Sequence, residues 1–442
     1  MSSDASVTAA APPEPTQAAP FSRTYTSYAL WLLLIVSTLN YLDRQVVNIL
    51  AESIKQDLNL SDTQIGLLTG LAFALFYTFL GLPIARLADN QKSSRVTIIA
   101  VSLALWSGMT VVCGLAQNFA QLLLARVGVG VGEAGCAPAA HSLITDMVAP
   151  EKHASAIAFY GIGIPVGGLL GMVLGGVLTD LYGWRSAFLV LGLPGLLFAI
   201  LLVYTLKEPR RVFAAEALRS NAPAAPSMSF REAIAEVMGS RAFVLITVAA
   251  SFVAFLSYGK TVWQAILFIR THDLSPGQVG IWLGISVGIA GSIGMFLGGF
   301  FADRLGARDP RRILAAPIIG MLFGAPLLMA GYMHPDWRVA LLLIFLPSMA
   351  NTLFYGPTFS CVQRLVSPPA RAMATAIILF TINLVGLGLG PLFFGMLSDA
   401  FQPIAGDQSV RWVLVGAAAL GVVPALFFWL ASRHLTRELK IT

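Results

Sequence analysis

The sequence predicts an all-α polytopic membrane protein, with twelve transmembrane helices in two pseudo-symmetric six-helix bundles. Three observations predict this fold: the composition, the recurrence of apolar runs and an internal repeat. Of the 442 residues, 57% are hydrophobic and only 11% are charged, whereas about a quarter of the residues of a soluble protein are charged. Apolar runs of roughly 20 residues recur along the chain, and a helix of that length crosses a bilayer of about 30 Å.

The apolar runs place the twelve spans in order, with short polar turns between them. They cover residues 27–50, 64–87, 95–116, 119–147, 152–181, 185–206, 242–270, 278–302, 312–333, 338–366, 370–399 and 410–433. Residues 1–24 are rich in Ala, Pro, Ser and Thr and lack the features of a cleavable signal, so we expect a disordered cytoplasmic tail there. Residues 437–442 form a second short tail.

Lysine and arginine fall mostly on one side of these spans. With the N-terminus inside, about 20 of the 28 lie in cytoplasmic segments and about five lie outside. This asymmetry predicts a multi-pass protein of the inner or plasma membrane with both termini cytoplasmic. The net charge of +6 therefore follows the membrane and does not indicate nucleic acid. The three cysteines and five histidines are scattered, so neither a disulfide nor a metal site is expected.

The second half of the chain repeats the first. SDTQIGLLTG (61–70) matches SPGQVGIWLG (275–284) at an offset of 214 residues, and PEKHASA (150–156) matches PARAMAT (369–375) at an offset of 219. The second offset also aligns Asp180 with Asp399. Repetition in the same order and orientation predicts two parallel halves of six helices each.

A polar stretch separates the two halves. We expect bundles over residues 25–207 and 241–436, with a cytoplasmic linker over 208–240. The linker ends in SFREAIAEVMGS, where Ser229 and Glu232 have the spacing of a capping box. A short amphipathic helix is therefore predicted, lying either on the membrane surface or free in solvent. Two such halves form the architecture in which a central cavity opens alternately to each side.

The loop after span 8 reads GGFFADRLGAR (298–308), and its counterpart after span 2 reads GLPIARLADNQKSSR (81–95). GGFFADRLG resembles the loop signature of the major facilitator superfamily, while the first copy keeps Asp89 but departs from that pattern at two positions. An aspartate here can meet the N-terminus of a neighbouring helix, where anions are stabilised. We therefore expect Asp89, Asp303 and Arg304 to form a conformational latch. The alternative is an ordinary polar turn.

Span 4, LLLARVGVGVGEAGCAPAAHSLITD, carries two charges within an apolar helix. Arg126 and Glu133 are seven residues apart, so two helical turns place them on nearly one face, roughly 10 Å apart along the axis. That face should look into the protein, because neither charge tolerates lipid. RVGVGVGEA resembles span 4 of the superfamily, where the arginine often lies near the substrate and the coupling machinery. The alternative is a purely structural ion pair.

NYLDRQ (40–45) places two more charges, Asp43 and Arg44, in span 1. An ionised side chain near the bilayer centre costs on the order of 3 kcal/mol, and adjacent residues cannot pair face to face along one helix. We expect Arg44 near Glu133, and Asp43 near Arg126 or Arg44. Burial and a neighbouring cation act in opposite directions on the pKa of a carboxylate, so Asp43 and Glu133 are predicted to couple protons. A structural brace is the alternative.

NYLDRQ together with GVGEAG resembles the Spinster lineage, whose members are associated with the transport of lysolipids and sphingoid phosphates. The resemblance implies that Asp43 is the coupling acid and that Arg44 or Arg126 meets an anionic head group. A planar guanidinium suits a phosphate because it donates two parallel hydrogen bonds. With Asn40, these two arginines form the substrate-binding set predicted in the first half.

The second half supplies fewer charges. Lys260, in the outer third of span 7, either snorkels outward, lines a gate or touches the substrate. Tyr355 of span 10 is predicted to bind the substrate, although aromatic residues here also serve as packing. A cavity that is polar on one half and aromatic on the other would suit an amphiphile.

We therefore expect a proton-coupled secondary active transporter that works by alternating access on a lysolipid or a sphingoid-phosphate-like amphipathic anion. The alternative is a proton-coupled symporter of a small organic anion or a sugar. GISVG (284–288) fits the nucleophile-elbow pattern of hydrolases, and GVGEAG (130–135) fits the dinucleotide-binding pattern. Both patterns require a strand, a turn and a helix, but both segments lie inside apolar helices. An enzyme acting on lipid is therefore disfavoured, and a non-transporting sensor is a third reading. We expect a monomer among membrane lipids, without a cofactor.

Overall fold

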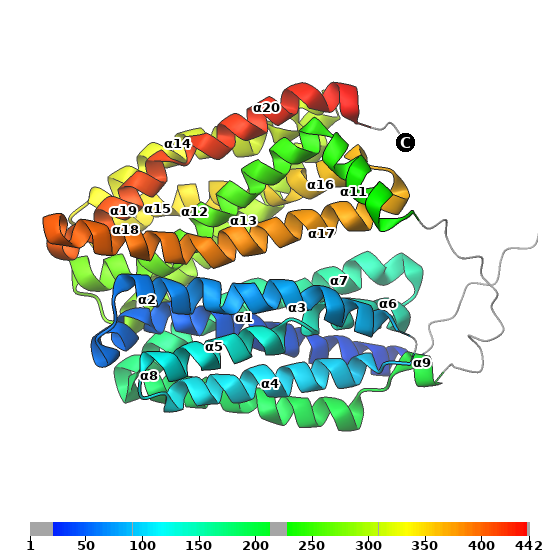
Figure 1. Ribbon diagram of the computed structural model, residues 1–442, viewed down its shortest axis with the longest axis horizontal. Coiled ribbons are helices and arrows are strands. Elements are labelled where there is room, and N and C mark those ends of the chain that lie inside the picture. Colours follow the sequence, from blue (N-terminus) through cyan, green and yellow to red (C-terminus); the bar gives the residue numbers. More distant parts are fainter. Residues whose placement is uncertain (1–20, 91, 213–227, 308, 440–442) are drawn as a thin grey trace, which may run out of the picture.

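The computed structural model describes residues 21–90, 92–212, 228–307 and 309–439, which are almost entirely helical (Figure 1). Most of the predicted N-terminal tail, the middle of the linker and residues 440–442 lie outside the described residues. The first half contains α1 (Arg23–Leu58), α2 (Asp62–Gly66), η1 (Leu67–Leu71), α3 (Ala72–Asp89), α4 (Arg95–Leu115), α5 (Phe119–Glu133), α6 (Cys136–Met147), η2 (Pro150–Lys152), α7 (His153–Gly161), α8 (Gly163–Thr205) and α9 (Pro209–Val212). The second half contains α11 (Phe230–Gly239), α12 (Arg241–His272), α13 (Pro276–Gly306), η3 (Pro310–Leu314), α14 (Ala315–Met333), α15 (Trp337–Thr352), α16 (Tyr355–Leu365), η4 (Pro368–Ala370), α17 (Arg371–Thr381), η5 (Ile382–Leu389), α18 (Gly390–Ala405), η6 (Gly406–Gln408), α19 (Ser409–Ala419) and α20 (Val422–Glu438).

Within the described residues, ten helical stretches are long and apolar enough to cross a membrane. Two of them, Pro150–Thr205 with 56 residues and Pro368–Glu438 with 71, are each long enough for two crossings, since one crossing takes about 20 residues. Gly183, at a φ of 81°, interrupts the first stretch, and Gly406, at a φ of 54°, interrupts the second. Glycine adopts this backbone geometry without the steric cost that other residues bear. The prediction of a twelve-helix, all-α membrane protein is confirmed.

The two halves form two bundles that lie side by side (Figure 1). The turn between α1 and α2 and the turn between α18 and α19 lie at one end of the bundles, which we call the gate end. The C-terminus, α9 and α11 lie at the opposite end, which we call the linker end. Across the interface, α8 packs against α13, α2 packs against α18, and α1 contacts α12.

Helix irregularities repeat between the halves. The helix of span 4 is interrupted at residues 134–135, and that of span 10 at residues 353–354, which is the same place at the offset of 219. Spans 2 and 11, which are not equivalent in the repeat, each contain a π-helical turn, η1 and η5. Such turns are rare, and those that occur are often found at functional sites. These turns face each other so closely that a side chain at Gly70 would collide with the carbonyl oxygen of Gly388.

The predicted linker helix is present as α11. Ser229 accepts a hydrogen bond from the backbone of Glu232, and the Glu232 side chain accepts one from the backbone of Ser229. This is the reciprocal capping box that the sequence predicted. Ala233 and Val237 are buried, where α11 packs against α17 and η4.

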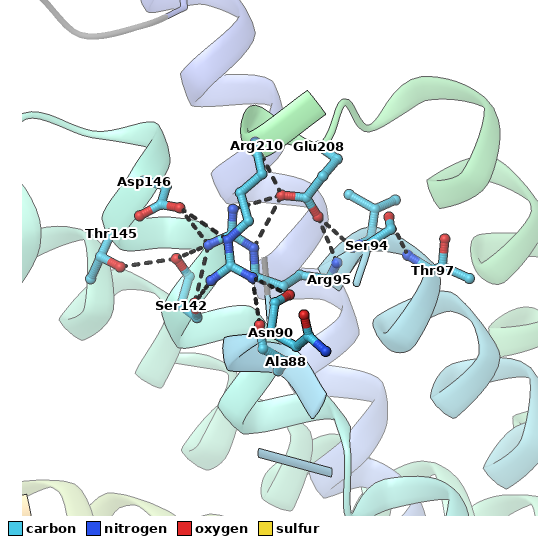
Figure 2. A network of polar contacts seen from close by, with 11 residues as sticks. Ala88, Asn90, Ser94, Arg95, Thr97, Ser142, Thr145, Asp146, Glu208 and Arg210 are labelled. Atoms are coloured by element: carbon cyan, nitrogen blue, oxygen red, sulfur yellow. Dashed lines mark hydrogen bonds and ion pairs between the residues drawn. The ribbon is translucent and has the colours of Figure 1, made fainter. Parts of the chain in front are cut away.

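A buried ion cluster ties the start of the linker to the first bundle (Figure 2). Glu208 accepts hydrogen bonds from the Arg95 guanidinium at 2.6 and 3.1 Å and from the Arg95 backbone at 2.6 Å. Arg95 is fully buried, and its other nitrogen reaches Asp146 at 2.6 Å. Arg210 donates to the backbone carbonyls of residues 88 and 90. The cluster therefore fixes the linker to α3, α4 and α6 at once.

The variant Arg95→Leu should lower the stability of the protein. Glu208, which is 6% exposed, would lose its cation, and removing one partner of a buried ion pair costs about 3–5 kcal/mol. Thermal unfolding of the purified protein in detergent would measure the loss. Arg86→Leu, which removes an exposed arginine, is the matched control, and equal unfolding temperatures for the two variants would contradict a structural role for the cluster.

Candidate functional site

The charged residues predicted in spans 1 and 4 meet inside the first bundle. Arg44 of α1 places Nε 2.6 Å from Oε2 of Glu133, the last residue of α5. Glu133 is 1% exposed, so this is a charge pair removed from water. Because the two residues lie on different helices, the pair also fixes α1 against α5. The predicted pairing of Arg44 with Glu133 is confirmed.

Asp43 pairs with Arg126, as was also predicted, but loosely. The Oδ2 atom of Asp43 lies 3.7 Å from Nη1 of Arg126, and both side chains are buried. Within the described residues, Asp43 Oδ2 and the Nε and Nη1 atoms of Arg126 have no hydrogen-bond partner. A charge-assisted hydrogen bond is normally about 2.7–2.9 Å long, so Arg126 has donor capacity that Asp43 does not use.

The hydroxyl of Thr110, in α4, can form a hydrogen bond with Asp43 whether the carboxyl group is ionised or protonated. This hydroxyl contacts Asp43 Oδ1 and lies 2.9 Å from the carbonyl oxygen of Trp106. A hydroxyl has one proton to donate but can also accept. An ionised Asp43 takes the proton of Thr110; a protonated Asp43 donates to Thr110, which then donates to Trp106. In either state the hydrogen bond between Oδ1 of Asp43 and the Thr110 hydroxyl is kept without moving the backbone.

Aromatic rings surround the guanidinium of Arg44. Its central carbon lies 4.4 Å from the ring centre of Tyr77, 4.9 Å from that of Phe73 and 5.1 Å from that of Tyr41. Cation–π contacts of this kind stabilise a cation that has lost its hydration. The predicted residue Asn40 lies one helical turn before Arg44 and is buried with its Nδ2 unpartnered among the described residues.

The second half contributes aromatic residues to the same region. Tyr258 of α12 interacts electrostatically with Arg44, Tyr77 and Tyr355. Tyr355 in turn interacts with Tyr41. Lys260 is placed elsewhere, because its polar contact is with Asn351 of α15, at 3.4 Å. Of the two substrate-binding residues predicted in the second half, the structure therefore brings Tyr355 toward the cluster and leaves Lys260 apart from it.

The predicted latch residues lie at the linker end, and among the described residues no hydrogen bond or ion pair joins their side chains to the other half. Asp89, Asp303 and Arg304 are exposed, and in the part of the chain that the structure describes neither aspartate forms an ion pair. Arg304 lies over the ring of Phe300, with 5.9 Å from its central carbon to the ring centre. The latch therefore stays a prediction.

The gate end, by contrast, is closed by a polar cluster that joins the halves. Arg270 of α12 contacts Asp62 at 2.7 and 3.0 Å and Glu52 at 2.7 Å. Asp399 of α18 accepts hydrogen bonds from the backbone nitrogens of Asp62 and Thr63, at 3.0 and 2.8 Å. This carboxylate stabilises the positive end of the helix that starts at Asp62.

The first half makes the reciprocal contact. Asp180 of α8 accepts hydrogen bonds from the backbone nitrogen of Gly277, at 3.0 Å, and from the Ser275 hydroxyl, at the start of α13. Each half therefore places one carboxylate on the N-terminus of a helix of the other half. Sequence reasoning missed this role, although the repeat had already aligned Asp180 with Asp399. We call the five residues Glu52, Asp62, Asp180, Arg270 and Asp399 the gate cluster.

Comparison with known proteins agrees with the architecture. Residues 33–308 and 252–440 match the family model described as Major Facilitator Superfamily. An MFS-type efflux pump of Mycolicibacterium smegmatis is 34% identical, over 93% of this chain and 94% of that protein. Protein spinster homolog 1 of Xenopus tropicalis is 26% identical, over 92% of this chain and 81% of that protein. A hexuronate transporter of Bacillus subtilis is 25% identical, over 88% of this chain and 92% of that protein.

A solved structure is similar over the whole molecule. It is that of a bacterial homolog of the human lysosomal transporter Spinster in an inward-facing and unoccupied conformation. It is 32% identical in sequence, with a TM-score of 0.85, and the match covers 95% of this chain and all of that one.

Weakening the gate cluster should open the gate end. In the double variant Asp180→Asn, Asp399→Asn each helix N-terminus loses its anion, an interaction that contributes about 0.3–1 kcal/mol and at most about 2. The population with a separated gate end should rise several-fold. Spin labels at the exposed positions Tyr182 and Gln402, on opposite halves, would report it as a longer distance. Asp407→Asn, an exposed acid, is the control, and an unchanged distance distribution in the double variant would contradict the assignment.

Proposed function

Because the chain belongs to the Major Facilitator Superfamily and is a transporter of the Spinster type, we propose that it couples the movement of protons to that of an amphipathic anion. A lysolipid or a sphingoid-phosphate-like molecule is the proposed substrate. The observation that carries the proposal is the buried cluster of Asp43, Arg44, Arg126 and Glu133. A membrane protein retains such a cluster at a considerable cost in free energy, and function is the common reason.

Asp43 is proposed to carry the proton. Its pairing with Arg126 is loose, whereas Glu133 is held at 2.6 Å by Arg44. The Thr110 hydroxyl supports Asp43 in both protonation states. Glu133 then serves mainly to orient Arg44 and to balance its charge. This division gives the two predicted coupling acids, Asp43 and Glu133, different parts in one cluster.

Protonation of Asp43 would release Arg126. While Asp43 is ionised, it competes with any anionic substrate for the guanidinium; once protonated, it no longer attracts the cation. The free N–H groups of Arg126 and the neighbouring Arg44 can then bind a phosphate or carboxylate head group. Binding of the proton and of the anion would favour each other, and by linkage the effect is reciprocal.

The aromatic residues favour an amphiphilic substrate over a small polar one. Tyr41, Phe73 and Tyr77 surround Arg44, and Tyr258 and Tyr355 approach from the other half. A head group bound at the arginines would have its apolar part against these rings. Asn40 supplies one further donor at the same level.

The closed gate cluster suggests the state that the structure represents. With both termini cytoplasmic, as the distribution of lysine and arginine predicts, the gate end faces outward and the state is inward-facing. The exposed Asp89, Asp303 and Arg304 would then engage when the linker end closes. Alternating access would exchange one set of contacts for the other. The inner membrane of a bacterium is the location that fits this arrangement.

The decisive experiment uses protein in liposomes with a trapped pH dye and an imposed proton gradient. The wild type should move protons, at a rate that a lysolipid changes, whereas Asp43→Asn should not exceed protein-free liposomes. Asp407→Asn should behave as the wild type. If Asp43→Asn moves protons normally, Asp43 is structural or binds substrate directly, and the coupling mechanism is wrong.

Substrate affinity should depend on pH through the same residue. Because protonation of Asp43 releases Arg126, binding of a lysolipid to the wild type should tighten as the pH falls. In Asp43→Asn, which mimics the protonated state, affinity should be high and nearly independent of pH. Equilibrium binding of a fluorescent lysolipid across a pH series measures both, and parallel pH profiles would exclude competition for Arg126.

A second candidate is a proton-coupled symporter of a small organic anion or a sugar. The similarity to a hexuronate transporter, whose named substrate class is an acidic sugar, favours it. Displacement of the bound fluorescent lysolipid by a panel of lysolipids, carboxylates and sugars separates the two. Displacement by lysolipids at micromolar concentration supports the amphiphile; displacement by hexuronates alone supports the second candidate.

A further inference from the structure

Lys260 lacks a carboxylate partner in its own half. After Arg241 the chain contains seven acidic residues. Six of them lie at or near helix ends, namely Asp273, Asp303, Asp309, Asp336, Asp407 and Glu438, and Asp399 is held by the backbone at the start of α2. Lys260 lies instead in the middle of α12. In the first half, Asp43 and Glu133 already have Arg126 and Arg44 as counter-charges. The ammonium group of this half-buried residue is therefore a positive charge without a carboxylate beside it among the described residues.

The polar contact of Lys260 is weak. Its Nζ atom lies 3.4 Å from Oδ1 of Asn351, at the limit of a hydrogen bond, and the Nδ2 atom of Asn351 donates to Ser257 at 2.7 Å. An ammonium group has three N–H donors, so Asn351 satisfies one at most. A charge in such surroundings is unfavourable unless it is paired or loses its proton.

Lys260 and Asn351, which are both half-buried, line a partly open cavity in the second bundle. The cavity lies between α12, α14, α15 and the junction of α19 with α20, and its other walls are apolar, formed by residues such as Leu256, Met321 and Leu328. Its volume is about 30 Å³, which is enough for about two water-sized particles. An amphiphile does not fit, but a single small ion does.

We propose that Lys260 and Asn351 form a binding site for a small monovalent inorganic anion of the size of a halide. The ammonium group supplies the charge, the cavity supplies room for one ion, and the apolar walls exclude larger or more strongly hydrated anions. The ion compensates Lys260 where the described part of the chain provides no carboxylate. The site is separate from the Asp43 cluster and does not depend on the proposed substrate.

The test measures thermal unfolding of the purified protein in sodium chloride and in sodium gluconate at equal ionic strength. Chloride should raise the unfolding temperature of the wild type by a few degrees and in a saturable manner, because a ligand that binds only the folded state stabilises it. Lys260→Met should unfold at the same temperature in both salts. Lys152→Met, which removes an exposed lysine, should keep the chloride effect.

A second variant keeps the test decisive if Lys260→Met folds poorly. Asn351→Asp places a permanent carboxylate next to Lys260, so the folded variant should no longer respond to chloride. Line broadening of the chloride-35 resonance by the wild type, reversed by bromide and absent with Asn351→Asp, is the direct readout of binding. A wild type that does not respond to chloride, or an Asn351→Asp variant that responds as the wild type does, would overturn the proposal.

Discussion

Neutralising charge where water is absent is the constraint on which the rest of this structure depends. An ionised side chain inside a bilayer must find a partner, and residues adjacent on one helix cannot supply it. Asp43 and Arg44 therefore reach to Arg126 and Glu133 of another helix. The two pairs hold α1 against α5. They also bring the Asp43 carboxylate next to Arg126, a cation with unused donors, and the proposed coupling rests on this arrangement.

The pseudo-symmetry of the halves has two consequences. Where the halves meet, it produces reciprocal contacts, since Asp180 and Asp399 occupy equivalent positions and each stabilises a helix start of the opposite half. Inside the bundles the chemistry diverges. The first half contains the self-neutralising cluster, whereas the second places aromatic residues opposite it and leaves Lys260 beside a small cavity.

The polar contacts described between the halves are concentrated at the gate end. At one end of the molecule, the gate cluster combines the buried ion pairs of Arg270 with Asp62 and Glu52 with helix-capping hydrogen bonds, each of modest free energy. The buried pairs are costly to break one partner at a time, but both partners can be hydrated together when the halves separate. Glycines there let the helices approach closely, as Gly176 does at the start of α13. At the other end the latch residues are exposed. A protein that alternates between two arrangements needs interfaces of this kind, in which one set of weak contacts replaces another.

The sequence by itself determined the twelve spans, the two halves, the capping box of α11 and the charges that must pair, because lipid forbids an unpaired charge and a helix must cross the bilayer whole. It could not decide which carboxylate holds its cation tightly, because that depends on the distance from each carboxylate to an arginine on another helix. The gate cluster and the isolation of Lys260 were likewise decided by the tertiary structure. Both arise where segments more than 90 residues apart in the sequence meet. A local sequence pattern cannot predict such contacts.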